Sequence, residues 1–163
     1  MAVTFNADEV FAMAEQIERN GAKFYRKAAT LPAAKGKTAL LEKLAAMEDE
    51  HEKTFHAMRE QLGLKDKGGV SFDPNQEAEL FLQAVADGHV FDTSLDPSET
   101  LAGDETMTDV LHVAIGLEKD SIVFYLGMKS AVGQRLGKDK LDAIIAEEMG
   151  HVALLSRELD RLN

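Results

Sequence analysis

Two copies of one set of acidic and imidazole residues form the most specific chemical pattern in this sequence. In each copy a glutamate is followed 30 residues later by a Glu-x-x-His pair: Glu18, Glu48 and His51 in the first, Glu118, Glu148 and His151 in the second. Residues three apart on a helix share a face, so each pair could offer one ion a carboxylate oxygen and an imidazole nitrogen. Together the six side chains predict a site for two metal ions.

These polar side chains interrupt stripes of apolar residues, which places them in the interior of the predicted fold. Glu48 and His51 lie between Leu44 and Phe55 at three- and four-residue steps. Four ionised glutamates could not share one interior without positive charge, because burial and mutual repulsion both oppose their ionisation. Two divalent cations would supply the four positive charges that balance them.

The two halves of the chain are repeats related by a shift of 100 residues. Both tyrosines of the chain obey this shift, as Tyr25 and Tyr125. Glu147 could also pair with His151, because the two are four residues apart. The repeat, however, sets Met47 opposite Glu147, which favours Glu148 as the ligand.

The elements that must position these residues are helices. Helix-forming residues with apolar positions three and four apart predict long helices at about residues 7–30, 38–63, 106–132 and 137–162. We therefore expect an all-α fold, a four-helix bundle made of two pseudo-symmetric helical hairpins joined by a long crossover. A single domain would span residues 1–163, with hairpin 1 at about 7–63, the crossover at about 64–105 and hairpin 2 at about 106–162.

The crossover is long enough to run the length of the bundle and is expected to contain a short helix. Asp73, Pro74 and Gln76 provide helix start signals ahead of an apolar stretch. The segment from Gly88 to Gly103 is expected to be loop. The crossover also carries apolar residues that need covering, which favours a homodimer: Leu80, Phe81, Leu82, Val85, Val90 and Phe91.

Composition excludes several classes of function. The chain has 163 residues, and 18 basic against 29 acidic side chains give a formal net charge of -11, which argues against a nucleic-acid surface. There is no cysteine, so disulfides, iron-sulfur clusters and thiol nucleophiles are excluded. No apolar run is long enough for a membrane span and no secretion signal is evident, so no membrane partner and a cytoplasmic location are expected.

The local strings around the six candidate ligands resemble the rubrerythrin branch of the ferritin-like superfamily, and the similarity covers all four long helices. The strings are Glu18-Arg-Asn-Gly-Ala-Lys-Phe-Tyr25 with Glu48-Asp-Glu-His51, and Glu118-Lys-Asp-Ser-Ile-Val-Phe-Tyr125 with Glu148-Met-Gly-His151. The resemblance implies a ferritin-like bundle in which these glutamates and histidines ligate two irons, with Glu48 and Glu148 as bridging ligands. It also implies that Tyr25 and Tyr125 assist catalysis by hydrogen-bonding to the carboxylates.

The activity implied by the resemblance is reduction of hydrogen peroxide or dioxygen at the di-iron centre. Rubrerythrins append a cysteine-ligated rubredoxin domain that delivers electrons, whereas this chain would need an external donor, a rubredoxin-like protein or a reductase. Rubrerythrins also place an additional glutamate three residues after Glu118, where this chain has Ser121, so the centre looks more symmetric, like that of a bacterioferritin. Gly21, one turn after Glu18, could leave an opening for a small oxidant.

Two other functions fit the same residues. Within the resemblance, the chain could be a ferroxidase or iron-handling protein, through which iron passes instead of cycling between oxidation states. In a different class, the ions would only neutralise the core of a metal-stabilised interaction module. Manganese or zinc could replace iron in either case, because carboxylate and imidazole ligands accept all three metals.

Overall fold

The structure is a computed structural model that describes residues 6–63, 77–86, 92–131 and 137–162. It confirms the all-α fold class. Four long helices form the bundle, and each ends within three residues of its predicted limits: α1 (Ala7–Ala29), α2 (Thr38–Glu60), α4 (Met107–Ala131) and α5 (Lys138–Asp160). The described part of the chain contains no strand.

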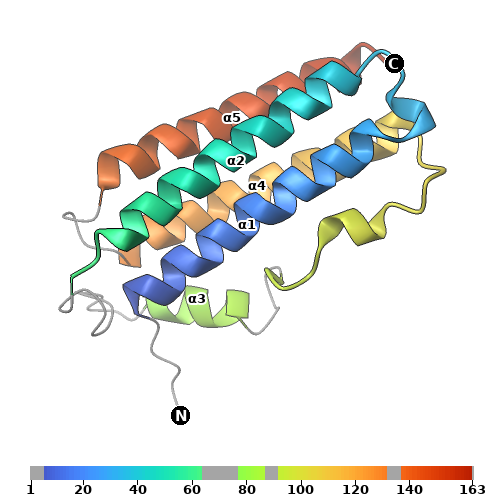
Figure 1. Ribbon diagram of the computed structural model, residues 1–163. Helices are drawn as coiled ribbons and strands as arrows, with labels where there is room; N and C mark the ends of the chain where they lie inside the picture. Colours follow the sequence, from blue (N-terminus) through green and yellow to red (C-terminus); the bar gives the residue numbers. More distant parts are fainter. Residues whose placement is uncertain (1–5, 64–76, 87–91, 132–136, 163) are drawn as a thin grey trace.

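The helices pack as two antiparallel hairpins, α1 with α2 and α4 with α5, as Figure 1 shows. A capping box starts α1, in which Asn6 and Glu9 each accept a hydrogen bond from the other's backbone N–H. Glycines with a left-handed backbone lie at both hairpin turns, with φ of 84° at Gly36 and 82° at Gly137. The predicted turn residues 132–136 lie outside the described part of the chain.

The six candidate ligands divide the core into two apolar clusters. Along α1, Phe11 and Ala14 belong to one cluster, Phe24 and Tyr25 to the other, and Glu18 lies between them. The same division recurs on the other three long helices. A layer of polar residues therefore crosses the middle of the bundle, sealed by apolar side chains above and below.

The crossover contains the expected short helix, α3 (Glu77–Ala86), which packs against α4. A side chain at Gly127 would meet Phe81, since a Cβ built there lies 2.3 Å from the ring carbon Cε1, so glycine permits this close approach. Leu82 and Val85 are buried in the same core. Their burial removes part of the ground for expecting a dimer, because the chain itself covers them.

Several residues of the predicted crossover lie outside the described ranges. These are the helix start signals Asp73, Pro74 and Gln76 and the apolar residues Val90 and Phe91. Leu80, in contrast, is described and 65% exposed.

The second part of the crossover is not all loop, as was expected from Gly88 to Gly103. A short 3-10 helix, η3 (Pro97–Thr100), forms because Asp96 accepts a hydrogen bond from the backbone N–H of Ser98 and Pro97 occupies the first turn. This segment runs beside α1 (Figure 1). The sequence prediction missed η3 because its start signals, Asp96 and Pro97, lie in a stretch rich in turn-forming residues.

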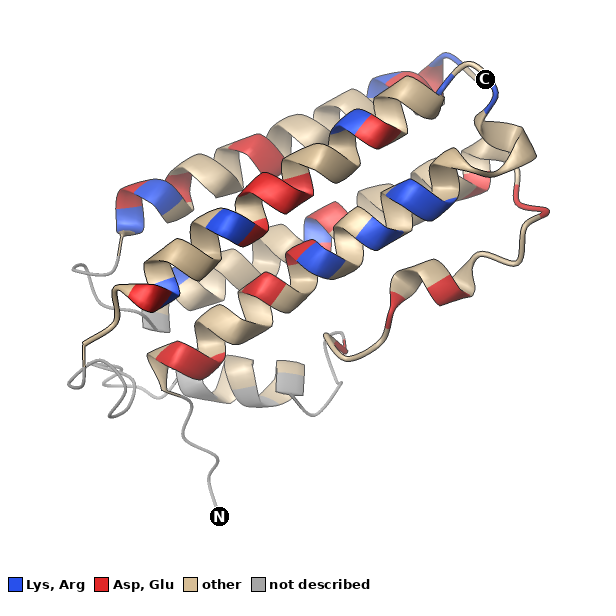
Figure 2. Ribbon diagram, viewed as in Figure 1, with Lys and Arg blue, Asp and Glu red and all other residues tan. Residues whose placement is uncertain are grey.

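Three residues on one side of α1 fasten this segment to the bundle. The Asn20 amide donates to the carbonyl oxygens of Thr93 and Leu95, at 2.9 and 3.1 Å. Lys23 pairs with Asp96 at 3.2 Å, and Lys27 donates to the carbonyl oxygen of Ser98 at 2.7 Å. Figure 2 shows the basic residues of α1 and the acidic residues on the segment beside it.

No described helix combines the length and the apolar character that crossing a membrane requires.

We expect Asn20→Ala to lower the free energy of unfolding by about 1 to 3 kcal/mol, because it removes three hydrogen bonds of a buried amide, two donated to the segment and one accepted from Gln16. The matched control is Lys23→Ala on the same helix. The Lys23 side chain is half exposed in its ion pair with Asp96, so Lys23→Ala should lower the free energy of unfolding by less than about 1 kcal/mol. Urea denaturation followed by circular dichroism measures both. Equal losses in the two variants would contradict the fastening role of Asn20.

Candidate metal centre

The six predicted ligands converge at the middle of the bundle, and every one is buried. Each of the four long helices contributes. Glu18 comes from α1 and Glu118 from α4, while α2 and α5 each supply a glutamate and a histidine one turn apart. None of the six residues is more than 4% exposed. The sequence prediction therefore named side chains that the structure brings together.

The ligand atoms form two overlapping groups. One group comprises Glu18, Glu48, His51 and Glu148, and the other comprises Glu48, Glu118, Glu148 and His151. Within each group the candidate donor atoms lie within 4.8 Å of one another. Both groups contain Glu48 and Glu148, the two residues predicted to bridge the metals. Two adjacent ions sharing two carboxylates would fit this arrangement.

Both histidines turn Nδ1 toward the carboxylates. His51 Nδ1 lies 2.9 Å from Glu148 Oε1 and 3.4 Å from Glu18 Oε2. His151 Nδ1 lies 3.0 Å from Glu148 Oε2 and 3.4 Å from an oxygen of Glu118. The two imidazole rings stack with centroids 5.9 Å apart. Glu148 therefore stands between the two histidines.

The two tyrosines cross-link the hairpins. Tyr25 of the first hairpin donates its hydroxyl hydrogen bond to Glu118 of the second, and Tyr125 donates to Glu18. Both rings are fully buried. Burial, together with the neighbouring carboxylates, raises the pKa of each tyrosine well above its usual value, so both hydroxyls stay protonated donors. Each glutamate contributed by α1 or α4 is thus held by the tyrosine of the opposite hairpin.

Burial without a cation changes the ionisation of the cluster. It raises the pKa of Glu18, Glu48 and Glu118 above the usual range of a carboxyl group. Burial also opposes ionisation of Glu148, but close contacts with the protonated rings of His151 and His51 outweigh it and lower the Glu148 pKa. The cluster therefore favours one firmly ionised carboxylate between two cationic rings.

The histidines respond in the opposite direction. Burial disfavours their protonated forms, yet contacts with Glu148 and Glu18 raise the pKa of His51 to about 11. Contacts with Glu118 and Glu148 likewise raise the pKa of His151 to about 12. In the metal-free chain, protons thus supply the positive charge that the carboxylates require.

Unpartnered polar atoms show that the cluster fits metal ions better than it fits protons alone. Among the described residues, buried atoms without a hydrogen-bond partner include Glu18 Oε2, Glu48 Oε1, Glu148 Oε1 and His51 Nδ1. His51 Nδ1 is close to Glu148 but makes no well-directed hydrogen bond to it. Unpartnered buried polar atoms are costly. Oxygen and imidazole donors of this kind are ligands that iron, manganese and zinc accept.

Glu147 has a contact that the sequence did not predict. Its Oε2 lies 2.9 Å from Nε2 of His51, on the neighbouring helix α2. The partner could not be read from spacing within one helix, because the contact joins the two hairpins. Within the described part of the chain His151 Nε2 has no hydrogen-bond partner, and the residue equivalent to Glu147 is Met47. The repeat is therefore broken outside the ligands.

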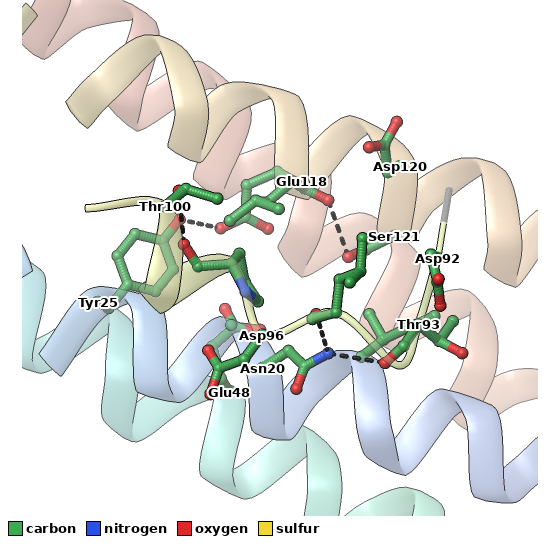
Figure 3. Close-up of a pocket in the computed structure, with 15 residues that line it drawn as sticks. Asn20, Tyr25, Glu48, Asp92, Thr93, Asp96, Thr100, Glu118, Asp120 and Ser121 are labelled. Atoms are coloured by element: carbon green, nitrogen blue, oxygen red, sulfur yellow. Dashed lines mark hydrogen bonds between the residues drawn. The ribbon is translucent and has the colours of Figure 1, made fainter. Parts of the chain in front are cut away.

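A pocket of about 210 Å³ opens beside the cluster, between α1, α4 and the segment 92–100 (Figure 3). Its floor includes Glu48, Glu118 and Tyr25. Gly21 is the expected opening on α1, where a Cβ would lie 3.1 Å from Glu48 Oε2, tighter than most such contacts. Its repeat equivalent, Ser121, lines the same pocket from α4. Small residues at both positions leave this space open.

Among solved structures, the fold is similar to that of a candidate ferritin-like diiron-carboxylate protein from Thermotoga maritima. The TM-score is 0.77, and the match covers 98% of each chain at 22% sequence identity. No protein-family model matches this chain, and no curated protein matches it significantly. At that identity the comparison establishes a ferritin-like fold.

We expect zinc binding at pH 7 to release at least two protons per chain. His51 and His151 are protonated in the metal-free cluster because their pKa values are far above 7, and metal-bound imidazole must give up that proton. Zinc affinity should therefore rise with pH. Calorimetric titrations in buffers of different ionisation enthalpy count the protons. The control is His112→Gln, which should release the same number, and release of less than one proton would contradict the expectation.

We expect Glu147→Ala to weaken zinc binding by about 10- to 100-fold, the usual cost of removing a carboxylate that orients a metal-bound histidine. Competition with a chelator measures the affinity. Glu50→Ala is the control, since Glu50 is exposed and forms an ion pair with its helix neighbour Lys53, away from the cluster. An unchanged affinity in Glu147→Ala would mean that this contact does not position His51.

Proposed function

We propose that this chain is a dinuclear iron-binding oxidoreductase of the rubrerythrin type, which reduces hydrogen peroxide or dioxygen with electrons from an external donor. The observation that carries the proposal is the pair of four-residue groups that share Glu48 and Glu148. Single metal sites do not need shared carboxylates, whereas a dinuclear centre does. The ferritin-like fold supports the same function.

Each residue has a role that follows from its position. Glu18 and His51 would hold one iron, Glu118 and His151 the other, and the two shared glutamates would bridge them. A ferrous pair held by these residues would supply the two electrons that reduction of an O–O bond requires.

Hydrogen bonds from the two tyrosines and the contact with Glu147 would hold these ligands in position. Tyr25 and Tyr125 keep the carboxylates of Glu118 and Glu18 in place by donating hydrogen bonds. Glu147 orients the His51 ring by contacting its outer nitrogen. These contacts fix the donor atoms before a ligand arrives, which lowers the reorganisation needed during reaction.

The pocket between α1 and α4 gives the oxidant its route to the centre. It reaches Glu48 and Glu118 and is open to solvent beside the segment 92–100. The rest of the cluster is sealed by the two apolar clusters. Apolar layers around such an opening protect a reduced centre from unwanted side reactions.

We propose that the electron donor is a separate protein, because the chain has no cysteine that could ligate a redox centre of its own. We also propose that the chain forms a homodimer. Exposed apolar side chains on the α4–α5 hairpin, Val123, Leu126 and Met149, offer a surface for a second copy.

The decisive test measures metal content and reactivity under anaerobic conditions. We expect two irons per chain and rapid oxidation of the ferrous-loaded protein by one equivalent of hydrogen peroxide, followed by its optical absorption. Glu48→Ala should lower iron content below two, because it removes a shared ligand. Glu42→Ala, an exposed change on the same helix, should leave both measurements unchanged.

Other outcomes would favour the alternative functions. Oxidation by dioxygen with release of ferric iron, in a large hollow assembly, would favour iron handling. Two bound metals without any oxidation would favour a metal-stabilised interaction module. Absence of peroxide-dependent oxidation would overturn the peroxidase activity.

A further inference from the structure

The pocket beside the candidate centre is larger than hydrogen peroxide or dioxygen needs. Its volume is about 210 Å³. An engineered cavity of about 150 Å³ in another protein binds benzene. Hydrogen peroxide or dioxygen would leave most of this space unfilled, so its size points to an organic ligand.

Two repeat-related pairs of residues shape the sides of the pocket. Ile17 and Leu117 supply apolar walls from α1 and α4, while Gly21 and Ser121 supply the space between them. The segment 92–100 adds apolar cover through Leu95 and Pro97. A mostly apolar pocket with a few polar groups at one end is the usual form of a small-molecule site.

Aspartates along the pocket select against an anionic ligand. Asp92, Asp96 and Asp120 line it, whereas protons or bound metal neutralise the floor carboxylates Glu48 and Glu118. A carboxylate or phosphate ligand would meet like charge from the aspartates. Figure 3 shows these labelled side chains around the space.

The apolar walls also select against a hydrated cation. Asp96 is already engaged by Lys23 and the backbone of Ser98, and Asp92 accepts hydrogen bonds from Ser94. A cation would therefore lose water of hydration without gaining a free carboxylate from these two residues. An uncharged molecule gives up the least hydration free energy when it enters the pocket.

We infer that this pocket binds a small, uncharged organic molecule, of benzene size or slightly larger, beside the candidate centre. This binding does not rest on the proposed function. The apolar part of the ligand lies between Ile17 and Leu117, and a polar end faces Glu118 and the Tyr25 hydroxyl.

Ser121 is the residue that keeps the pocket open from α4. It is nearly buried, and its hydroxyl is turned back to the carbonyl oxygen of Leu117 at 3.0 Å. A large side chain at this position would project into the space that the ligand occupies. Ser121 is therefore the position at which pocket volume can be changed without touching a candidate metal ligand.

The test uses zinc-loaded protein, so that binding is measured without redox turnover. Three probes of similar shape differ in charge: benzyl alcohol is neutral, benzoate is anionic and benzylamine is cationic at pH 7. We expect benzyl alcohol to bind at least about tenfold more tightly than either charged probe, as measured by calorimetry or ligand-observed NMR. Tighter binding of benzylamine or benzoate would overturn the assignment to an uncharged ligand.

Ser121→Phe should weaken benzyl alcohol binding by more than about tenfold while zinc content stays the same, because the phenyl ring fills the pocket. The matched control is Ser156→Phe. Ser156 lies on α5, is partly buried and donates to the carbonyl oxygen of Val152 in the same way, but does not line the pocket. Equal binding by wild type and Ser121→Phe would place the probe elsewhere and overturn the inference.

A measurement on the wild-type chain covers the case in which Ser121→Phe disturbs folding. Nuclear Overhauser effects should connect the benzyl ring with the methyl groups of Ile17 and Leu117. Contacts instead with the exposed methyls of Val113 or Val123 would overturn the inference. Probe binding without peroxide reactivity supports the inferred ligand pocket and contradicts the proposed function. Peroxide reactivity without probe binding supports the proposed function and contradicts the inferred ligand pocket.

Discussion

The burial of four carboxylates in one layer is the constraint on which the rest of this structure depends. Such a layer is stable only if positive charge enters with it, as protons on His51 and His151 or as metal ions. The apolar clusters on either side can form only when that charge is balanced. The tyrosine contacts between hairpins and the short side chains at Gly21 and Ser121 are arranged around this one layer.

Much of this arrangement could be predicted from the sequence because its signals are local and repeated. A Glu-x-x-His pair lies on one helical face, and its duplication at an equal spacing identifies the facing helices. The helix limits follow from apolar periodicity and from turn residues such as Gly36. The all-α class and the meeting of the six side chains rest on these regularities.

The remaining features join residues that no short-range pattern connects. Spacing along the helix pairs Glu147 with His151, yet Glu147 contacts His51 on the other hairpin. Asn20 gives no sign in the sequence that it fastens a segment more than 70 residues away. The same holds for Phe81 against Gly127, a fit set by side-chain volume. Tertiary packing decides these contacts, and a single sequence does not display it.

Each candidate ligand group takes residues from both hairpins, so neither hairpin can complete a metal position alone. Bound ions would therefore cross-link distant parts of a chain that has no disulfide. Glu48 and Glu148 are about 100 residues apart. A covalent link that closes a loop of this length raises the free energy of the unfolded chain by about 4.7 kcal/mol, because it removes conformational entropy. A chelator would thus lower the stability of the whole bundle as well as remove its chemistry, because bound metal favours the folded state over the unfolded chain.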